Sequence, residues 1–288
     1  MTFLLLPMKG QMKTLSSLVE DMYKTLEDCE KISEEQIQLL SKLLTDTITN
    51  RLSQSSKRRD HLSLSSIGKP LRRLWYDLKD PIDSDEEPSN NRLKFLYGDI
   101  IETLLLWLAQ VSGHEVKDCQ KEVNHHGVIG HIDSIIDGEV VDVKSASPRS
   151  YMKFARGTLT DDDPFGYLAQ IQSYDEEVGK GHPAFLVMNK VTGEICLYQP
   201  DKDFDLPDTE QLIDSCREVL SKDTPPLQKC YADVEDGKSG NRCLDKGCLY
   251  CPYKRRCWPN LRAFEYSNGT KYLTQVIKEP KVKEIDLD

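Results

Sequence analysis

Residues 128–144 read Val-Ile-Gly-His-Ile-Asp-Ser-Ile-Ile-Asp-Gly-Glu-Val-Val-Asp-Val-Lys, and this stretch decides the fold. Asp137-Gly138 separates two runs rich in β-branched residues, which is a strong signal for a tight β-hairpin. With these two residues as the loop, the register follows by counting back along both strands. The predicted pairs are Ile136 with Glu139, Ile135 with Val140, Ser134 with Val141, and Asp133 with Asp142.

The predicted pair of Asp133 and Asp142 places two carboxylates directly opposite each other, which like-charge repulsion disfavours. A divalent cation between them would make the arrangement tolerable, because hard cations prefer carboxylate oxygens. Lys144 lies on the same face as Asp142, since strand side chains alternate. His131 falls opposite Lys144 in the same register, where it would support the site or be an ordinary strand residue. The hairpin therefore predicts a metal site beside a lysine, with Val141 and Val143 on the core face.

Composition limits the class of protein. The 288 residues are 38% hydrophobic and 30% charged, which is typical of a globular chain with a substantial core. The net charge of −10 argues against general nucleic-acid affinity but leaves room for a local basic groove. Residues 1–7 are too short an apolar run for a secretory signal, and no segment reaches the roughly 18–20 apolar residues of a membrane helix. We therefore expect a cytoplasmic protein without membrane contacts.

Two helices are expected in the N-terminal region, residues 1–60. Apolar residues recur three and four positions apart from Leu15 to Leu26, and Ser33-Glu-Glu-Gln has the pattern of a helix N-cap. The pair is either an ordinary helical hairpin or a cap over a substrate channel. Residues 51–79 then mix cations with aromatic residues, which suits phosphates and unstacked bases. The candidate DNA-binding residues follow Lys57-Arg58-Arg59 and are Lys69, Arg72, Arg73, Trp75 and Tyr76; the alternative places Trp75 and Tyr76 in the core.

The middle of the chain alternates helices and strands. Residues 80–91 read as a loop, and residues 93–108 as a helix too apolar for the surface, so that it would pack on the sheet. Glu102 in this helix is costly to bury unless it is paired or ligating. After a loop at 145–166, a helix at 167–178 carries Gln170 and Tyr174 on one face. Two strands at 184–188 and 194–198, a helix at 208–221, a hairpin through Asn268-Gly269 and a tail from Lys278 complete the expected elements.

The set of Glu102, Asp133, Asp142-Val143-Lys144, Gln170 and Tyr174, in this order of helix, hairpin and helix, resembles the PD-(D/E)XK nucleases, specifically the RecB-like exonuclease branch. The resemblance covers about residues 63–260, and the Ser65–Tyr76 and Glu265–Thr270 stretches look like bacteriophage-encoded members. It implies an α/β fold with a restriction-endonuclease-like core, a mixed central sheet flanked by helices. A helical part would precede this core and a part stapled by a cysteine-bound metal would follow it.

The resemblance also implies roles. Asp133, Asp142 and the carbonyl of Val143 would bind Mg²⁺ or Mn²⁺, and Glu102 would be an outer ligand. Lys144 would orient the attacking water, and Gln170 and Tyr174 would position the DNA backbone and the lysine. Asp142 stands where Glu is commoner, and many relatives have a histidine in the place of Glu102. The implied activity is a metal-dependent DNA exonuclease that cuts from single- or double-stranded ends, with phage recombination or replication proteins as partners in a host cytoplasm. The alternatives are a structure-specific or restriction-like endonuclease and a non-catalytic DNA-binding module.

Cysteines give a second metal prediction. The chain has nine, an odd number, and in a cytoplasmic chain a local cluster indicates metal ligation rather than disulfides. Four thiolates suit zinc or a 4Fe-4S cluster. In the iron–sulfur nucleases that this segment resembles, the fourth cysteine ligand lies far upstream. This chain has Leu71 at that place, so a cysteine within the cluster would supply the fourth ligand. The predicted ligands are Cys243, Cys248, Cys251 and Cys257.

The expected domain boundaries follow these patterns. A nuclease core occupies residues 61–225 after the helical region. A Cys-rich metal-binding segment at 226–262 and a C-terminal hairpin and tail at 263–288 complete the chain.

Overall fold

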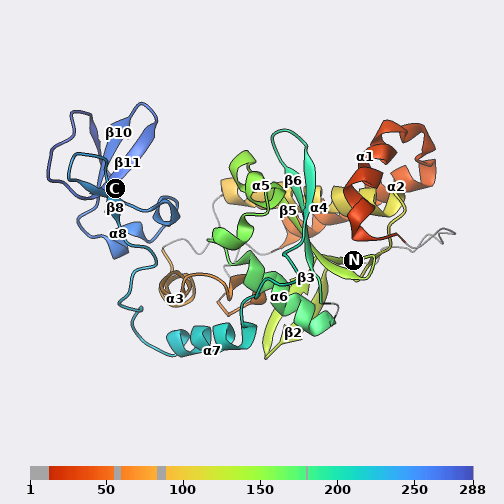
Figure 1. Cartoon of the computed structure of the whole chain (residues 1–288), viewed down its shortest axis with the longest axis horizontal. Helices are drawn as coiled ribbons and strands as arrows, with labels where there is room; N and C mark the ends of the chain where they lie inside the picture. The colour runs from red at the N-terminus through yellow and green to blue at the C-terminus, as the bar shows by residue number, and fades with distance from the viewer. Residues whose placement is uncertain (1–12, 55–59, 83–88, 180, 288) are drawn as a thin grey trace. The chain divides into compact units, whose positions relative to one another are not determined.

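The computed structural model describes residues 13–54, 60–82, 89–179 and 181–287. The chain forms two compact units, each built from two separate stretches of sequence (Figure 1). Unit 1 comprises residues 1–68 and 84–213, and unit 2 comprises residues 69–83 and 214–288. The fold is mixed α/β with a helical N-terminal part and several sheets, as expected at the level of class.

Unit 1 is built around a five-stranded sheet in the order β1-β4-β5-β6-β7. Strands β5 and β6 run parallel, with Val141 opposite Ala184, and the other neighbours are antiparallel. The expected strands at 184–188 and 194–198 are confirmed as β6 and β7. The strands are β1 (Val116–Lys117), β4 (Ser134–Ile136), β5 (Glu139–Ala146), β6 (Ala184–Asn189) and β7 (Ile195–Tyr198).

The predicted hairpin register is confirmed for the three residue pairs nearest the turn. Ser134 lies opposite Val141, Ile135 opposite Val140 and Ile136 opposite Glu139. The first strand, however, is interrupted at Asp133. Beyond this break β3 (Val128–Ile132) leaves the sheet and pairs with β2 (Lys121–His125). The expectation that His131 lies opposite Lys144 was therefore wrong: His131 pairs with Glu122.

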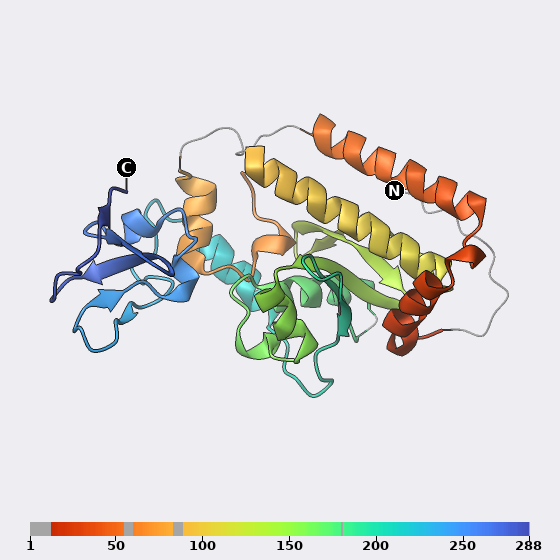
Figure 2. The same ribbon diagram turned by 90° about the horizontal axis from the view of Figure 1, so that it is seen from above.

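Helices α1 (Leu18–Glu27) and α2 (Glu34–Ser53) confirm the predicted N-terminal helices. Ser33 and Gln36 form a capping box at the start of α2, which satisfies backbone groups that a helix end leaves unpaired. Helix α4 (Ser89–Val111) includes the apolar segment and runs beside α2 (Figure 2). The α4 residues Leu105, Leu106 and Leu108 share one buried cluster with Val141 and Val143 of β5, so this helix packs on the sheet as predicted.

Two further helices complete unit 1. Residues 148–155 form α5 (Pro148–Ala155), although a loop was expected there. The Ser147 side chain caps this helix and Pro148 occupies its first position, which favours helix formation. The helix is too short to show an apolar periodicity in the sequence. Helix α6 (Tyr167–Val178) matches the prediction. Gly166, at φ +74°, precedes α6, and a Cβ on it would lie 2.4 Å from the Gly68 backbone, so the two glycines allow a close crossing.

Unit 2 has a second five-stranded sheet, β12-β10-β11-β9-β8, and a small aromatic core. The hairpin β10–β11 confirms the predicted turn near Asn268. The expected tail is not wholly irregular, because β12 pairs with β10. The chain enters unit 2 for the second time within α7 (Thr209–Leu220), the helix expected at 208–221. The other elements are α3 (Leu71–Lys79), β8 (Val234–Glu235), β9 (Arg242–Cys243), α8 (Lys254–Cys257), β10 (Arg262–Tyr266), β11 (Gly269–Gln275) and β12 (Glu284–Ile285).

None of the helices within the described ranges is both long and apolar enough to cross a membrane.

Candidate active site

The centre of the candidate site lies where β4 and β5 diverge in unit 1. Asp142 is 1% exposed, and the Nζ atom of Lys144 lies 2.6 Å from its Oδ2 atom. Asp133, at the break between β3 and β4, accepts a hydrogen bond of 2.8 Å from the backbone N–H of Val143. The structure therefore brings together Asp133, Asp142 and Lys144. Lys144 lies beside Asp142 as predicted, whereas the predicted pair of Asp133 with Asp142 is not part of the ladder, which ends at Ser134 and Val141.

Burial and mutual repulsion disfavour the charges of the two aspartates. Burial and the neighbouring Asp142 raise the pKa of Asp133 to about 7. Burial also raises the pKa of Asp142, although Lys144 opposes this change. Burial alone would lower the pKa of Lys144, but the carboxylates of Asp142 and Asp133 outweigh it and hold the pKa above its ordinary value. Lys144 is therefore a cation at neutral pH.

Glu102 joins these residues from helix α4, by way of a glutamine. The Nε2 atom of Gln120 lies 2.6 Å from Oε1 of Glu102 and 3.4 Å from Oδ1 of Asp133, so one amide group bridges both carboxyl groups. Burial, followed by the charge of Asp133, raises the pKa of Glu102 well above its ordinary value. Gln120 has a positive φ of 55°, a strained backbone conformation that is frequent at functional sites.

Helix α6 supplies the remaining predicted residues. The Nε2 atom of Gln170 donates a hydrogen bond of 3.2 Å to the hydroxyl of Tyr174. Tyr174 is 2% exposed, and its ring would lie 2.6 Å from a Cβ on Gly130, so only glycine fits beside it on β3. Tyr167, at the start of α6, places its ring centroid 4.7 Å from Nζ of Lys144, a cation–π contact.

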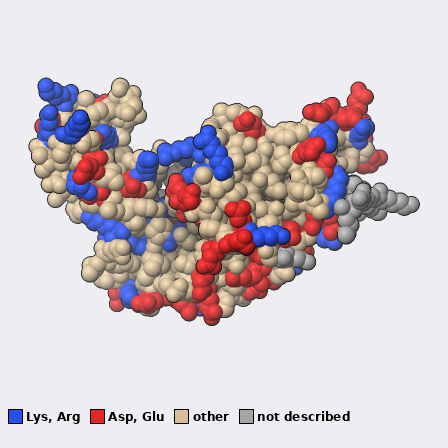
Figure 3. Space-filling model, viewed as in Figure 1, with Lys and Arg blue, Asp and Glu red and all other residues tan. Residues whose placement is uncertain are grey.

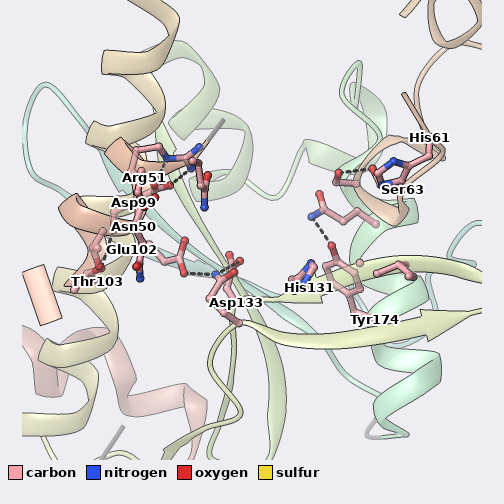
Figure 4. A pocket seen from close by; sticks show the side chains of 18 residues that line it. Asn50, Arg51, His61, Ser63, Asp99, Glu102, Thr103, His131, Asp133 and Tyr174 are labelled. Carbon is pink, nitrogen blue, oxygen red and sulfur yellow. Dashed lines mark hydrogen bonds and ion pairs between the residues drawn. The ribbon is translucent and has the colours of Figure 1, made fainter. Parts of the chain in front are cut away.

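A polar cavity of about 730 Å³ opens onto the site (Figure 4). Glu102 and Asp133 point into it from one side, and His131, Tyr174 and Ser63 border the other. Its lining also includes residues of α2, so this helix forms one wall of the cavity. The residues from α2 and its C-cap are Thr47, Asn50, Arg51, Ser53 and Gln54.

The site has features that suit a hard divalent cation. The Oδ1 atom of Asp142 is buried without a hydrogen bond, whereas the ammonium group of Lys144 lies 2.6 Å from Oδ2. Such an unsatisfied buried acceptor is costly and fits a missing ligand. Asp133, Asp142 and the backbone carbonyl of Val143 offer oxygen donors of the kind that Mg²⁺ prefers. Across the described ranges no group of three or more His, Cys, Asp or Glu side chains is arranged around a metal position.

Two site residues escaped the sequence-based reasoning. Gln120 lies in a turn between β1 and β2, where no periodicity marks it. Tyr167, by contrast, lies three positions before Gln170 on α6 and so shares its face, which is a detectable signal.

The predicted DNA-binding residues belong to unit 2 and are engaged in internal contacts. Trp75 and Tyr76 are each 6% exposed, and Tyr76 stacks on Tyr253, so their burial supports the core interpretation. Arg72 donates a hydrogen bond to the backbone carbonyl of Pro226. Lys69 and Arg73 both form ion pairs with Asp77: Nζ of Lys69 lies 3.1 Å and Nε of Arg73 lies 4.0 Å from its Oδ2 atom. Lys57-Arg58-Arg59 lies outside the described residues. On the face drawn in Figure 3, acidic and basic side chains are interspersed.

The four predicted cysteine ligands are not all brought together. Cys248, Cys251 and Cys257 influence one another electrostatically, and Cys251 and Cys257 pack on one aromatic core. Cys243 lies on β9, where the charges that act most on its thiol are those of Asp236, Lys271, Asp233 and Arg242.

Comparison with known proteins identifies no family. No family model matches the chain, and no curated protein matches it. One similar solved structure, described as "Crystal structure of SSO0001", has 14% sequence identity and a TM-score of 0.39, and the match covers 76% of this chain and 96% of that chain.

Proposed function

We propose that unit 1 is a Mg²⁺-dependent deoxyribonuclease of the PD-(D/E)XK type that hydrolyses phosphodiester bonds from DNA ends. The observation that carries this proposal is the group of Asp133, Asp142 and Lys144, in which the Oδ1 atom of Asp142 is buried without a hydrogen bond. Burying two neighbouring carboxylates is unfavourable for the metal-free fold, so a functional reason is expected.

Asp133, Asp142 and the carbonyl of Val143 would hold the cation, and Glu102 would lie in its outer surroundings. A bound Mg²⁺ supplies charge stabilisation and lowers the pKa of water, the two requirements of phosphodiester hydrolysis. Gln120 holds Glu102 and Asp133 at a fixed separation, since its amide contacts both. The overall reaction forms one bond from water oxygen to phosphorus and breaks one P–O bond, leaving a hydroxyl and a terminal phosphate.

Lys144 acts as a positive charge in this proposal. Its ion pair with Asp142 and its contact with the Tyr167 ring keep the ammonium group protonated and aimed at the site. A fixed cation can donate hydrogen bonds to the attacking water or to the phosphate and offset the negative charge that develops there. It is not the proton acceptor, because its pKa lies above the ordinary value.

The cavity argues for a DNA end as the substrate. Its volume of about 730 Å³ falls in the range of small-molecule sites, and its lining includes Glu102 and Asp133. The lining of hydroxyl, amide and imidazole groups can form hydrogen bonds with a sugar–phosphate backbone without reading its sequence. An end that frays into a single strand would enter such a cavity more easily than an internal bond of a duplex.

The test is an assay of end-labelled single- and double-stranded DNA with Mg²⁺ or Mn²⁺ for the wild type and the Asp133→Asn and Lys144→Met variants. Asp203→Asn is the matched control, because Asp203 is an exposed aspartate of unit 1. We expect cleavage by the wild type and the control, and none by the two site variants. Cleavage retained in both site variants would overturn the assignment of this site.

A covalently closed circular DNA separates the exonuclease from the endonuclease. An exonuclease degrades the linear form and leaves the circle intact. Cleavage of the circle at a comparable rate would replace the end-dependent activity with an endonuclease on the same residues.

A further inference from the structure

Unit 2 contains four thiols, between residues 230 and 257, that act on one another electrostatically. The thiol of Cys248 is acted on electrostatically by Cys251, Cys230 and Cys257, and that of Cys230 by Cys257 and Cys251. Cys230 was not among the ligands expected from the sequence. Cys243, which was, has acidic and basic side chains as its main neighbours instead.

Packing independently brings the segment that carries Cys230 against the segment that carries Cys248. Tyr231 follows Cys230, and Gly247 precedes Cys248. A Cβ on Gly247 would lie 2.5 Å from the ring of Tyr231, so the two segments are in direct contact next to their cysteines. The backbone N–H of Cys251 donates 3.1 Å to the carbonyl of Cys248, which forms the tight turn in which neighbouring thiols can share one metal.

The first turn of α3 provides positive charge for these thiols. The backbone N–H of Arg73 donates a hydrogen bond to the Cys230 thiol, and Nε of Arg72 lies 3.3 Å from Sγ of Cys257. The Nε atom of Arg73 is buried without a hydrogen bond, while its charge acts on Cys251. Burial raises the pKa of Cys230 and Cys251, and the helix N-terminus and guanidinium groups oppose this change by favouring thiolates, the form of cysteine that binds metals.

The cysteines lie beside one of the two places where unit 2 buries apolar residues. Trp75, Tyr76, Val219 and Tyr253 form a cluster against which Cys251 and Cys257 pack. The sheet of the unit buries others, including Leu244, Phe264 and Leu273. Domains with few buried apolar residues commonly rely on a metal or on disulfides for stability, and all nine cysteines are free thiols in this structure.

We propose that Cys230, Cys248, Cys251 and Cys257 hold a structural metal centre with four thiolate ligands, and that Cys243 is not a ligand. The centre joins the segment before β8, which carries Cys230, to the segment between β9 and β10, which carries the other three ligands. Four thiolates suit Zn²⁺ or a 4Fe-4S cluster. Within the described ranges the thiols are not yet arranged around one point, so rotation of their side chains closes the site.

The test compares Cys230→Ser with Cys243→Ser in the full chain, purified without oxygen after growth with zinc and iron. Cys230 and Cys243 have the same intermediate exposure, so they form a matched pair. Elemental analysis should find metal in the wild type and in Cys243→Ser at the same ratio, and its loss in Cys230→Ser. A visible charge-transfer band identifies an iron–sulfur cluster. Zinc found by elemental analysis in a protein without this band identifies a zinc site. Metal retained in Cys230→Ser, or lost only in Cys243→Ser, would overturn the proposal.

A second measurement uses the wild type alone, in case Cys230→Ser does not fold. Native protein is alkylated before and after the metal is removed by a chelator, and the labelled cysteines are mapped by mass spectrometry. We expect Cys243 to react in both samples and Cys230, Cys248, Cys251 and Cys257 only after removal. Labelling of Cys230 as fast as Cys243 in the first sample, or a wild type without bound metal, would refute the centre. Neither readout depends on nuclease activity.

Discussion

At the level of single residues, the negative charge of Asp133 lowers the stability of the metal-free protein. Its pKa rises from 3.8 in an unfolded chain to about 7 in the folded one, so folding favours the protonated form. This stabilising contribution is complete below pH 4 and is lost as the pH rises through about 7. A carboxylate held in this way is typical of a site in which function is maintained at the expense of stability.

Replacing Asp133 by Asn should therefore stabilise the metal-free protein at alkaline pH. The Asn oxygen can still accept the hydrogen bond of Val143, while the repulsion with Asp142 disappears. We expect a gain in unfolding free energy of about 1–3 kcal/mol at pH 8, shrinking toward zero near pH 4. Urea titrations in chelator at both pH values measure it. An equal change at pH 4 and pH 8 would show that charge is not the cause.

Lys144→Met should have the opposite effect on stability, because it leaves the buried Asp142 without its cationic partner. We expect a loss of about 2 kcal/mol at pH 8, and a smaller loss at acid pH, where Asp142 takes up a proton. The double variant Asp142→Asn with Lys144→Met should recover most of the loss. A double variant with the full loss would mean that the lysine stabilises through packing alone.

The part of the candidate site that lies on the hairpin was predictable from the sequence, because turn type and strand alternation are local rules. The two-residue loop at Asp137-Gly138 sets the register, and alternation then places Lys144 beside Asp142. Gln120 was not predictable, because its contacts to Glu102 and Asp133 join residues without any shared periodicity. Trp75 and Tyr76 show a related limit: aromatic and basic residues have the same pattern at a binding surface and around a core.

At the level of elements, helix α6 is positioned by a contact between two glycines. Gly166 and Gly68 approach so closely that a Cβ on Gly166 would lie 2.4 Å from the Gly68 backbone. Gly179, at the other end of the helix, has nearly the same positive φ, 73°, but a Cβ on it would meet no atom within 4 Å. The two ends of α6 thus share the same backbone conformation but differ in the space around it.

Alanine substitution at these two glycines separates backbone strain from steric overlap. Gly179→Ala should cost about 1 kcal/mol of unfolding free energy, from the positive φ alone. Gly166→Ala should cost at least about 3 kcal/mol and displace Gln170 and Tyr174, because backbone atoms cannot yield. Thermal unfolding compares the two variants. Similar costs would show that the crossing is loose.

Prediction of elements succeeded where the pattern is long. The two N-terminal helices, α4 and α6 have several turns of apolar spacing or a recognisable cap. Helix α5 and strand β12 are short, so they carry too few residues for a periodicity. The interruption at Asp133 is also invisible, since β-branched residues continue on both sides while the pairing partner changes from β5 to β2.

At the level of the whole molecule, each unit has its own proposed metal site. Unit 1 would gain stability from Mg²⁺, and unit 2 from the thiolate-bound metal, because a ligand stabilises the folded form that binds it. This division was not readable from the sequence, because Cys230 and α3 reach the C-terminal cysteines only through tertiary packing. Local spacing favoured Cys243 instead.

Calorimetry should detect the two sites separately. We expect two unfolding transitions, one raised by a few degrees on adding Mg²⁺ and the other lowered by a chelator of thiolate-bound metals. The Asp133→Asn variant should lose the first response and keep the second, and Cys230→Ser the reverse. A single transition that responds to both treatments would show that the units unfold together.

The insertion of α3 ahead of most of unit 1 has a consequence for synthesis on the ribosome. Residues 69–83 emerge early, but the cysteines and the aromatic partner Tyr253 that cover α3 come after residue 214. At ordinary bacterial and eukaryotic speeds this delay is roughly 10–40 s, during which Trp75 and Tyr76 have no core to enter. Unit 1 can complete its sheet in this interval, whereas unit 2 has to wait until Tyr253 and the cysteines have emerged. Metal insertion into unit 2 would accordingly follow the folding of unit 1.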